Sequence, residues 1–149
     1  MIETQTALHA RQNEDNDRST VQAVILAAGR GSRLGSAIKD GPKCLAQVGG
    51  RSLIEHQLDL LAEAGITRVA VTTGYRAAEV RKAVAGRAEV IHNHDWGKTE
   101  GLHSLYLCRD WVTGPLVVLN CDVLLEADML SRLLETGPDT LHFDSSSGD

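Results

Sequence analysis

The feature that most constrains this chain is an apolar segment that breaks into a loop rich in glycine and basic residues. Residues 21–27 read VQAVILA, and their length and β-branched content predict a strand buried in a sheet with helices on both faces. Gly29 and Gly31 follow this segment. Because glycine has no Cβ, we expect backbone with positive φ here, which lets an anion approach the N–H groups of the loop.

The charge of this loop is opposite to that of the whole chain. The 149 residues carry a formal net charge of -5, yet basic residues outnumber acidic ones in the loop. The bases are Arg30, Arg33, Lys39 and Lys43, and the single acid is Asp40. Cations and amide donors at the carboxyl end of a parallel strand favour phosphate binding.

The loop also has a purely structural interpretation, a tight turn with solvated basic residues, which is the more common meaning of two isolated glycines. Two other phosphate-binding motifs do not fit the spacing. The dinucleotide fingerprint G-x-G-x-x-G requires glycine at position 34, where Leu34 stands. The motif G-x-x-x-x-G-K-[ST] does not occur in the loop.

What remains is the combination LAAGRGSRL followed by PKCL, which resembles the signature of sugar-phosphate and choline-phosphate nucleotidyltransferases. The pattern is G-x-G-x-R-L and then P-K, matched by Gly29, Gly31, Arg33, Leu34, Pro42 and Lys43. The resemblance extends over residues 21–144. It implies an α/β fold with a three-layer, Rossmann-like, mostly parallel sheet and helices on both faces, as in nucleotide-diphospho-sugar transferases.

The resemblance also implies roles for residues of the loop. Arg33 would hold the β- and γ-phosphates of a nucleoside triphosphate, and Lys43 would bridge the α-phosphate and the incoming phosphate, so both are candidate catalytic residues. A phosphate nucleophile is already ionised near neutral pH, so cations and amide donors suffice for catalysis without a general base. The candidate nucleotide-binding residues of this region are Leu26, Ala27, Ala28, Gly29, Gly31 and Ser32.

Asp122 is the candidate metal ligand because it follows the apolar segment 115–120 at its carboxyl end. An aspartate at such a position more often caps a helix, and only the family resemblance favours the metal. The implied cofactor is Mg²⁺, which takes oxygen ligands and usually keeps waters and substrate phosphates. Relatives use a second carboxylate, for which we find no counterpart before Asp149.

The segment 98–107, KTEGLHSLYL, resembles the T-N-x-x-x-S-L form of choline-phosphate and phosphonate cytidylyltransferases, with Glu100 in place of the amide residue. This favours CTP. Thr99, Glu100, Gly101 and Ser104 are candidate base or ribose contacts, although Thr99 could instead cap the following helix. Tyr75 could wall the base pocket or pack on the surface.

Two histidines in the polar segment before this motif invite a zinc interpretation. His92 and His94 stand close to Asp95. A histidine pair without further ligands at the spacing of a closed site is more often part of a polar loop, which is the interpretation we prefer.

Hydrophobic periodicity predicts that strands and helices alternate along the chain. Helices are expected after the capping box Ser52-x-x-Glu55, with residues 54, 58 and 61 on the buried face, and again with residues 77, 80 and 84 inward. A helix over 101–111 should place Leu102, Leu105 and Tyr106 on one side, and a last helix should span 126–135. Strands are expected over 68–73, 88–92, 115–120, which reads as fully buried, and 140–143.

Composition places the chain among globular domains, with 42% hydrophobic and 23% charged residues. It shows no basic face for nucleic acid, no apolar run that could span a membrane and no signal peptide, so we expect no nucleic-acid partner and a cytoplasmic location. Three widely spaced cysteines argue against a disulfide framework or a zinc knuckle. The oligomeric state does not follow from the sequence.

We expect a flexible leader over 1–20 and a nucleotide-binding domain over 21–149 that is incomplete at its carboxyl end, because the last strand has no covering helix. Two functions stay open. The first is a Mg²⁺-dependent nucleotidyltransferase that transfers a nucleoside monophosphate, CMP from CTP, to choline phosphate, a phosphonate or a sugar 1-phosphate and releases pyrophosphate. The alternative is a catalytically incompetent nucleotide-binding or regulatory domain.

Overall fold

The computed structural model describes residues 20–30 and 41–136. Several predictions therefore fall outside the described residues. They are the leader up to residue 19, the loop positions Gly31, Ser32 and Arg33, and the strand at 140–143.

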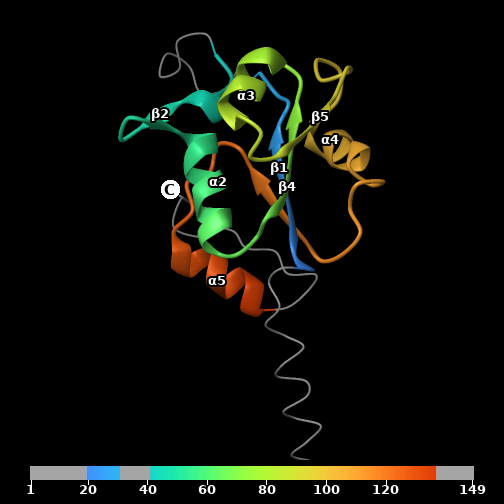
Figure 1. The fold of residues 1–149 in the computed structure, drawn as a ribbon. Coiled ribbons are helices and arrows are strands. Elements are labelled where there is room, and N and C mark those ends of the chain that lie inside the picture. Colours follow the sequence, from blue (N-terminus) through green and yellow to red (C-terminus); the bar gives the residue numbers. More distant parts are fainter. Residues whose placement is uncertain (1–19, 31–40, 137–149) are drawn as a thin grey trace, which may run out of the picture.

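The described chain is built on a parallel sheet of four strands in the order β5-β4-β1-β6 (Figure 1). Its strands are β1 (Gln22–Ala27), β4 (Arg68–Thr73), β5 (Glu89–His92) and β6 (Leu116–Asn120). β1 lies between β4 and β6, so that Ala23 is level with Val69 on one side and Val117 on the other. The prediction of a mostly parallel α/β sheet is confirmed.

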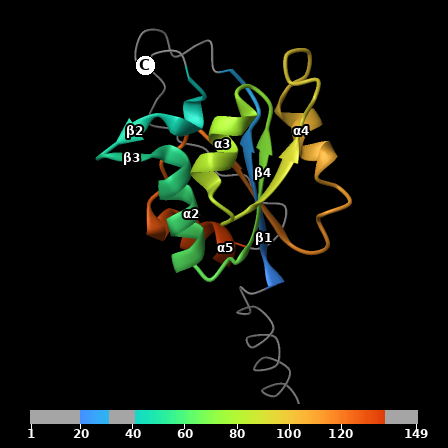
Figure 2. The same cartoon turned by 45° about the horizontal axis from the view of Figure 1, so that its top comes forward.

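Helices cover both faces of this sheet (Figures 1 and 2). One face carries α2 (Leu53–Glu63), α3 (Ala77–Val84) and α5 (Ala127–Glu135), and the opposite face carries α4 (Gly101–Leu107). The segment after the phosphate loop forms a 3-10 turn, η3 (Lys43–Leu45), and a short antiparallel hairpin of β2 (Gln47–Val48) and β3 (Arg51–Ser52). Among the described residues, no helix has both the length and the apolar composition to cross a membrane.

The predicted capping box at the start of α2 is present. The backbone N–H of Ser52 donates to Glu55 Oε2 at 2.8 Å, and the Ser52 hydroxyl donates to the same oxygen at 2.6 Å. These hydrogen bonds hold the pKa of Glu55 below its usual range. After the helix, Gly65 takes φ 82°, which glycine adopts without steric cost, and the chain turns into β4.

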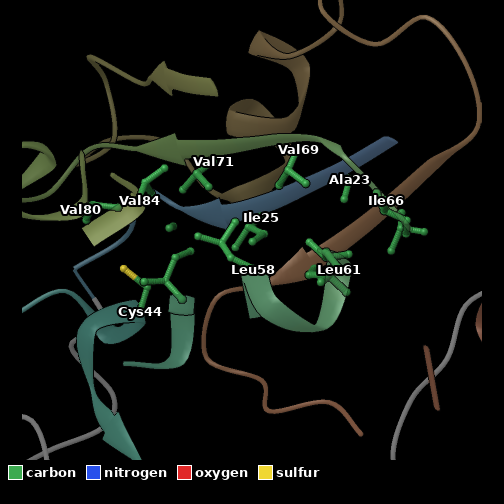
Figure 3. Close-up of a cluster of buried hydrophobic side chains, with 14 of the residues drawn as sticks. Ala23, Ile25, Cys44, Leu58, Leu61, Ile66, Val69, Val71, Val80 and Val84 are labelled. Carbon is green, nitrogen blue, oxygen red and sulfur yellow. The ribbon is translucent and has the colours of Figure 1, made fainter. Parts of the chain in front are cut away.

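The main core lies between the sheet and helices α2, α3 and α5. Alternate residues of β1, among them Ala23 and Ile25, point into it and meet Leu58 and Leu61 of α2 (Figure 3). A smaller cluster on the other face contains Val24, Ala70 and Cys108. Because β1 contributes to both clusters, it is buried on both faces, as the apolar residues 23–27 predict.

The predicted extent of the helix over 101–111 and the predicted full burial of the strand over 115–120 are wrong. α4 ends at Leu107, short of residue 111, and Leu102 and Tyr106 are exposed while Ser104 and Cys108 are buried. The hydrogen bonds of Ser104 described below, together with Trp111 and Val112 packing on the sheet, determine which side of this short helix turns inward. β6 is buried only at alternate positions, because Val118 faces away from the main core and stays 40% exposed.

Candidate nucleotide-binding site

A pocket of about 390 Å³ opens at the carboxyl ends of β1 and β6. The ends of parallel strands are where open α/β sheets bind ligands. The predicted site residues that line this pocket are Leu26, Ala28, Gly29, Lys43, Thr99, Glu100, Gly101, Ser104 and Asp122. The remaining lining residues are Asn93, Trp96, Asn120 and Cys121, which sequence reasoning missed.

Among the described residues, two that we predicted to bind nucleotide do not line the pocket. Ala27 is buried in the main core, and its N–H donates to the Thr72 hydroxyl at 3.2 Å. Tyr75 lies next to the lining residue Trp96, with 5.3 Å between the ring centroids. The aromatic surface that reaches the pocket is therefore that of Trp96.

Lys43 and Asp122 come from distant parts of the chain and form an ion pair at the pocket. Lys43 Nζ donates to Asp122 Oδ2 at 3.0 Å. Lys43 is part of the 3-10 turn η3, and Asp122 comes after β6. Both residues therefore lie at the carboxyl ends of the strands, where the pocket opens. Their side chains are 18% and 38% exposed, which leaves both within reach of a ligand.

Gly29 lines the pocket without the backbone conformation that we predicted. It is not among the described glycines with positive φ, which are Gly49, Gly50, Gly65 and Gly86. A Cβ built on Gly29 would meet no described heavy atom within 4 Å. The missing side chain thus leaves open space beside the strand end, where a ligand can approach the backbone.

Asn93 organises the other side of the pocket. Its side-chain amide is buried and donates to Thr99 Oγ1 and Ser104 Oγ, each at 3.0 Å. Its Oδ1 accepts from the backbone N–H of Asp95 at 2.9 Å. One buried side chain therefore ties β5 and the loop that follows it to α4. Asn93 is a polar residue directly after β5, and this position was the available sequence signal, much as Asp122 was found shortly after β6.

Thr99 does not cap α4, which was the alternative interpretation. The N-cap residue is Glu100, and the Thr99 hydroxyl donates to the carbonyl of Asp95 at 2.9 Å while it accepts from Asn93. Its hydrogen is therefore committed to the loop. Thr99 thus holds the wall of the pocket in shape.

Trp96 packs very closely against the turn after β4. A Cβ added to Gly74 would lie 2.4 Å from Trp96 Cβ and 2.7 Å from the carbonyl oxygen of Ala28. Only glycine lets the three chain segments meet at this point. The backbone N–H of Tyr75 also donates to this Ala28 oxygen at 2.9 Å, which fixes the turn to the end of β1.

Gln57 of α2 supports the segment that carries Asp122. Its buried side-chain amide donates to the carbonyl of Asn120 at 2.8 Å and to that of Val123 at 2.7 Å. These two acceptors flank Asp122 in the chain. A helix on the far side of the core thereby determines the path of the backbone at the pocket.

Two thiols lie directly beside the ion pair. Cys44 follows Lys43 and is fully buried, and Cys121 precedes Asp122 and lines the pocket. A hydrogen bond between the two thiols, together with burial, raises the pKa of Cys44 well above its usual range. The same hydrogen bond lowers the pKa of Cys121, with the Lys43 ammonium acting in the same direction and burial and Asp122 opposing it.

The described residues contain no group of three or more His, Cys, Asp or Glu side chains that could hold a metal ion. The imidazoles of His92 and His94 lie 4.5 Å apart, edge to face, and Thr73 Oγ1 is 3.2 Å from His92 Nδ1. Burial lowers the pKa of His92, and the neighbouring His94 adds to this effect. This arrangement fits the polar-loop interpretation of the histidine pair and gives no support to a zinc site.

A second hollow of about 370 Å³ lies at the opposite edge of the sheet, between β4, β5 and Trp111. None of the predicted site residues lines it. The guanidinium of Arg68 stacks on Trp111 there, 4.9 Å from the ring centroid, and donates to the carbonyl of the same residue. The hollow thus lies at the amino ends of β4 and β5, away from the carboxyl ends where ligands bind in such sheets.

The chain is similar in sequence to known nucleotidyltransferases. A family model described as a MobA-like NTP transferase domain matches residues 23–143. The CMP-5'-(3-aminopropyl)phosphonate synthase of Streptomyces rubellomurinus is 35% identical over 78% of this chain and 19% of its own length. The CTP:phosphoglutamine cytidylyltransferase of Campylobacter jejuni is 29% identical over 76% of this chain and 48% of its own.

Solved structures agree with these sequence matches. The CTP:phosphocholine cytidylyltransferase of Streptococcus pneumoniae superposes with a TM-score of 0.63 at 31% identity, over 69% of this chain and 45% of that one. A nucleotidyl transferase from Methanothermobacter superposes with a TM-score of 0.68 at 28% identity, over 78% and 57%. The chain spans about half or less of the length of the curated relatives named here.

Proposed function

We propose that this chain, which belongs to the family of MobA-like NTP transferase domains, transfers CMP from CTP to a small acceptor and releases pyrophosphate. The acceptor class is a phosphate monoester or a phosphonate, such as choline phosphate, a sugar 1-phosphate or an aminoalkyl phosphonate. The observation that carries the proposal is the Lys43–Asp122 ion pair at the edge of the strand-end pocket. The choice of CTP rests on the KTEGLHSLYL segment and on the names of the cytidylyltransferase relatives.

The proposed chemistry joins two anions. An acceptor oxygen attacks the α-phosphorus of CTP, and the bond from that phosphorus to the bridging oxygen of pyrophosphate breaks. Lys43 provides the positive charge that lets the reactants approach, and its ammonium exchanges the Asp122 carboxylate for phosphate oxygens as the nucleotide binds. The acceptor oxygen is already ionised, so no described residue has to act as a general base.

Arg33 completes the phosphate contacts in this proposal, although it lies outside the described residues. Its guanidinium would hold the β- and γ-phosphates through forked hydrogen bonds. Gly29 supports the same end of the triphosphate, because its open side lets phosphate oxygens reach the backbone.

The donor set of the pocket fits Mg²⁺. Asp122 offers one carboxylate at the pocket, and Mg²⁺ commonly binds through one or two carboxylates while waters and phosphate oxygens fill its other positions. Asp122 would hold the ion with Lys43 as its neighbour. When bound, the ion neutralises charge on the triphosphate and favours departure of pyrophosphate.

The cytosine and ribose are proposed to lie along the wall formed by Trp96 and the start of α4. Trp96 offers an aromatic surface, and Ser104 presents a hydroxyl whose oxygen accepts from Asn93. Glu100 lines the same wall and can accept a hydrogen bond from an amino group or a hydroxyl. A small pyrimidine needs fewer such contacts than a purine.

The test is pyrophosphate release by the 149-residue chain supplied with CTP, Mg²⁺ and single acceptors. The acceptors are choline phosphate, a sugar 1-phosphate and an aminoalkyl phosphonate, with the dephosphorylated alcohols as controls. Pyrophosphate release that requires an acceptor phosphorus group supports the proposal. Tight CTP binding without pyrophosphate release from any acceptor would instead favour a nucleotide-binding domain without turnover.

A further inference from the structure

Each residue of the ion pair at the pocket has a cysteine as its neighbour in the chain. Cys44 lies in η3, and Cys121 directly follows β6, 77 positions later in the numbering. They are the immediate chain neighbours of Lys43 and Asp122. The 3.0 Å separation of Lys43 Nζ and Asp122 Oδ2 shows that these two segments lie close together at the pocket. Cys121 also packs against the cluster of buried side chains to which Cys44 belongs, and Figure 3 shows Cys44 at the edge of that cluster.

The two cysteines differ in access. Cys44 is fully buried, whereas Cys121 is half-buried and lines the pocket of about 390 Å³. A small reagent that enters the pocket therefore meets Cys121 first, and Cys44 lies in the buried cluster against which Cys121 packs. This resembles the arrangement of an accessible reactive cysteine with a resolving cysteine nearby.

We propose that Cys121 and Cys44 form an oxidation site in the wall of the nucleotide pocket, where peroxide converts the two thiols into a disulfide that closes the site. In the first step the Cys121 sulfur attacks one oxygen of hydrogen peroxide, the O–O bond breaks, and a sulfenic acid and water form. In the second step the Cys44 sulfur attacks the sulfenic sulfur, the S–O bond breaks, and a second water leaves. Two thiols and one peroxide give one disulfide and two waters, so peroxide is reduced by the two electrons that the thiols lose.

The consequence for nucleotide binding, which rests on the proposed function, follows from the position of the bond. A disulfide tethers η3 to the end of β6, and these segments carry Lys43 and Asp122. Lys43 must leave Asp122 to contact phosphate, and the tether opposes any widening between them. CTP in the pocket would in turn cover Cys121, so nucleotide and peroxide compete.

The third cysteine provides an internal control. Cys108 is buried in the smaller cluster on the opposite face of the sheet, and its thiol contacts the carbonyl of Ser104 at 3.4 Å. Trypsin separates all three cysteines, because they fall in the peptides 44–51, 99–109 and 110–132. A disulfide between Cys44 and Cys121 is therefore distinguishable by mass from either pairing with Cys108.

The experiment treats the 149-residue chain with hydrogen peroxide, blocks free thiols, digests without reductant and measures peptide masses. We expect peptides 44–51 and 110–132 joined, at two hydrogens below their summed mass, and separated again by dithiothreitol. Cys108→Ala should leave this product unchanged. Cys44→Ala should stop at a Cys121 sulfenic acid that dimedone traps, and its melting curve shows whether that variant is folded. Oxidised chain without the 44–51 to 110–132 link would overturn the site, whatever the variants do.

The link to function has separate readouts. CTP with Mg²⁺ should slow formation of the disulfide several-fold, and the disulfide-linked chain should bind CTP several-fold more weakly until it is reduced. Because the disulfide is measured by mass without any nucleotide, its failure leaves the proposed function untouched. A disulfide that forms equally fast with CTP bound, in a chain whose CTP affinity is unchanged by oxidation, would overturn its role in closing the pocket.

Discussion

At the scale of single residues, Lys43 is the group on which the proposed chemistry depends most. We predict that Lys43→Ala lowers the rate of pyrophosphate release by about a hundredfold or more, the cost of losing one preorganised charge in a transition state. Stability should change little, because a partly exposed ion pair contributes about 0–1 kcal/mol. Rates from an acceptor titration and a thermal melt measure the two effects.

The matched control for Lys43 is Lys82→Ala, which removes an exposed lysine of α3. It should leave the rate of pyrophosphate release unchanged. A folded Lys43→Ala chain that releases pyrophosphate as fast as the Lys82→Ala chain would show that Lys43 is not catalytic.

Asp122 has a different expected signature because its proposed partner is a metal ion. We predict that Asp122→Asn weakens CTP binding in the presence of Mg²⁺ by at least tenfold and changes metal-free binding far less, since the amide is a poorer ligand for a hard cation. Calorimetric titration of CTP with and without Mg²⁺ measures this difference. Asp128→Asn, on the exposed side of α5, is the control. Equal losses with and without metal would assign Asp122 a structural role.

The sequence predicted both residues of the ion pair but not Asn93 and Trp96, which help to hold the pocket in shape. Lys43 belongs to the P-K motif after the glycine loop, and Asp122 comes shortly after the predicted strand over 115–120. Both signals lie within a few neighbouring residues, so the sequence shows them. Asn93 and Trp96 act through partners in other segments, namely Ser104 and Gly74. Such partners follow from three-dimensional packing and leave no periodic pattern in a short polar loop.

At the scale of elements, α2 controls the segment after β6 through one side chain. We predict that Gln57→Leu destabilises the chain by about 1–3 kcal/mol, because the carbonyl groups of Asn120 and Val123 lose the part-buried hydrogen bonds that the Gln57 amide donates to them. It should also weaken Mg²⁺-dependent CTP binding, because the backbone on both sides of Asp122 is released. Urea unfolding and CTP titration measure the two effects.

Gln47→Leu, in the exposed strand β2, is the control for Gln57 because it makes the same chemical change outside the core. It should leave CTP binding unchanged. If Gln57→Leu lowers stability but keeps the full Mg²⁺ dependence of CTP binding, the contact serves the core alone.

The turn after β4 gives a second prediction at this scale. Gly74→Ala forces Trp96 or the end of β1 to move, since the new Cβ would lie 2.4 Å from Trp96 Cβ. We expect lower CTP affinity and a changed tryptophan fluorescence spectrum. Gly97→Ala is the matched control, because a Cβ there meets no described heavy atom within 4 Å. Unchanged fluorescence and affinity in Gly74→Ala would show that the turn adjusts without Trp96.

The predictability of the elements follows from how local their signals are. Four adjacent residues, Ser52 to Glu55, determine the start of α2, and the structure forms the predicted capping box. Leu102 and Tyr106 suggest an apolar face of α4 but are exposed, whereas the hydrogen bond from Asn93 to Ser104 lies on the side that turns inward. A buried hydrogen-bond network can thus override hydrophobic spacing in a helix of seven residues.

At the scale of the whole molecule, the pocket joins the two sides of the sheet. Lys43 comes from the side of α2 and the main core, and Ser104 comes from α4 on the opposite side. β1 runs between these two sides and ends at the pocket with Ala28 and Gly29. A ligand that contacts both sides therefore links elements that otherwise meet only through the sheet, and its binding should be visible as a change in global stability.

This coupling gives the last prediction, that CTP with Mg²⁺ raises the Tm of the chain more than GTP or ATP at equal concentration. A ligand that binds only the folded state adds about 2.7 kcal/mol at a concentration one hundred times its Kd. For a domain of this size that corresponds to a shift of roughly 5–15 °C. The preference is expected because the segment 98–107, which lines the pocket, resembles that of cytidylyltransferases, and relatives of this chain carry that name. Lys43→Ala should reduce the shift with every triphosphate, since phosphate contacts are shared by all of them. A larger shift with either purine triphosphate would contradict the assignment to CTP and leave the phosphate site in place.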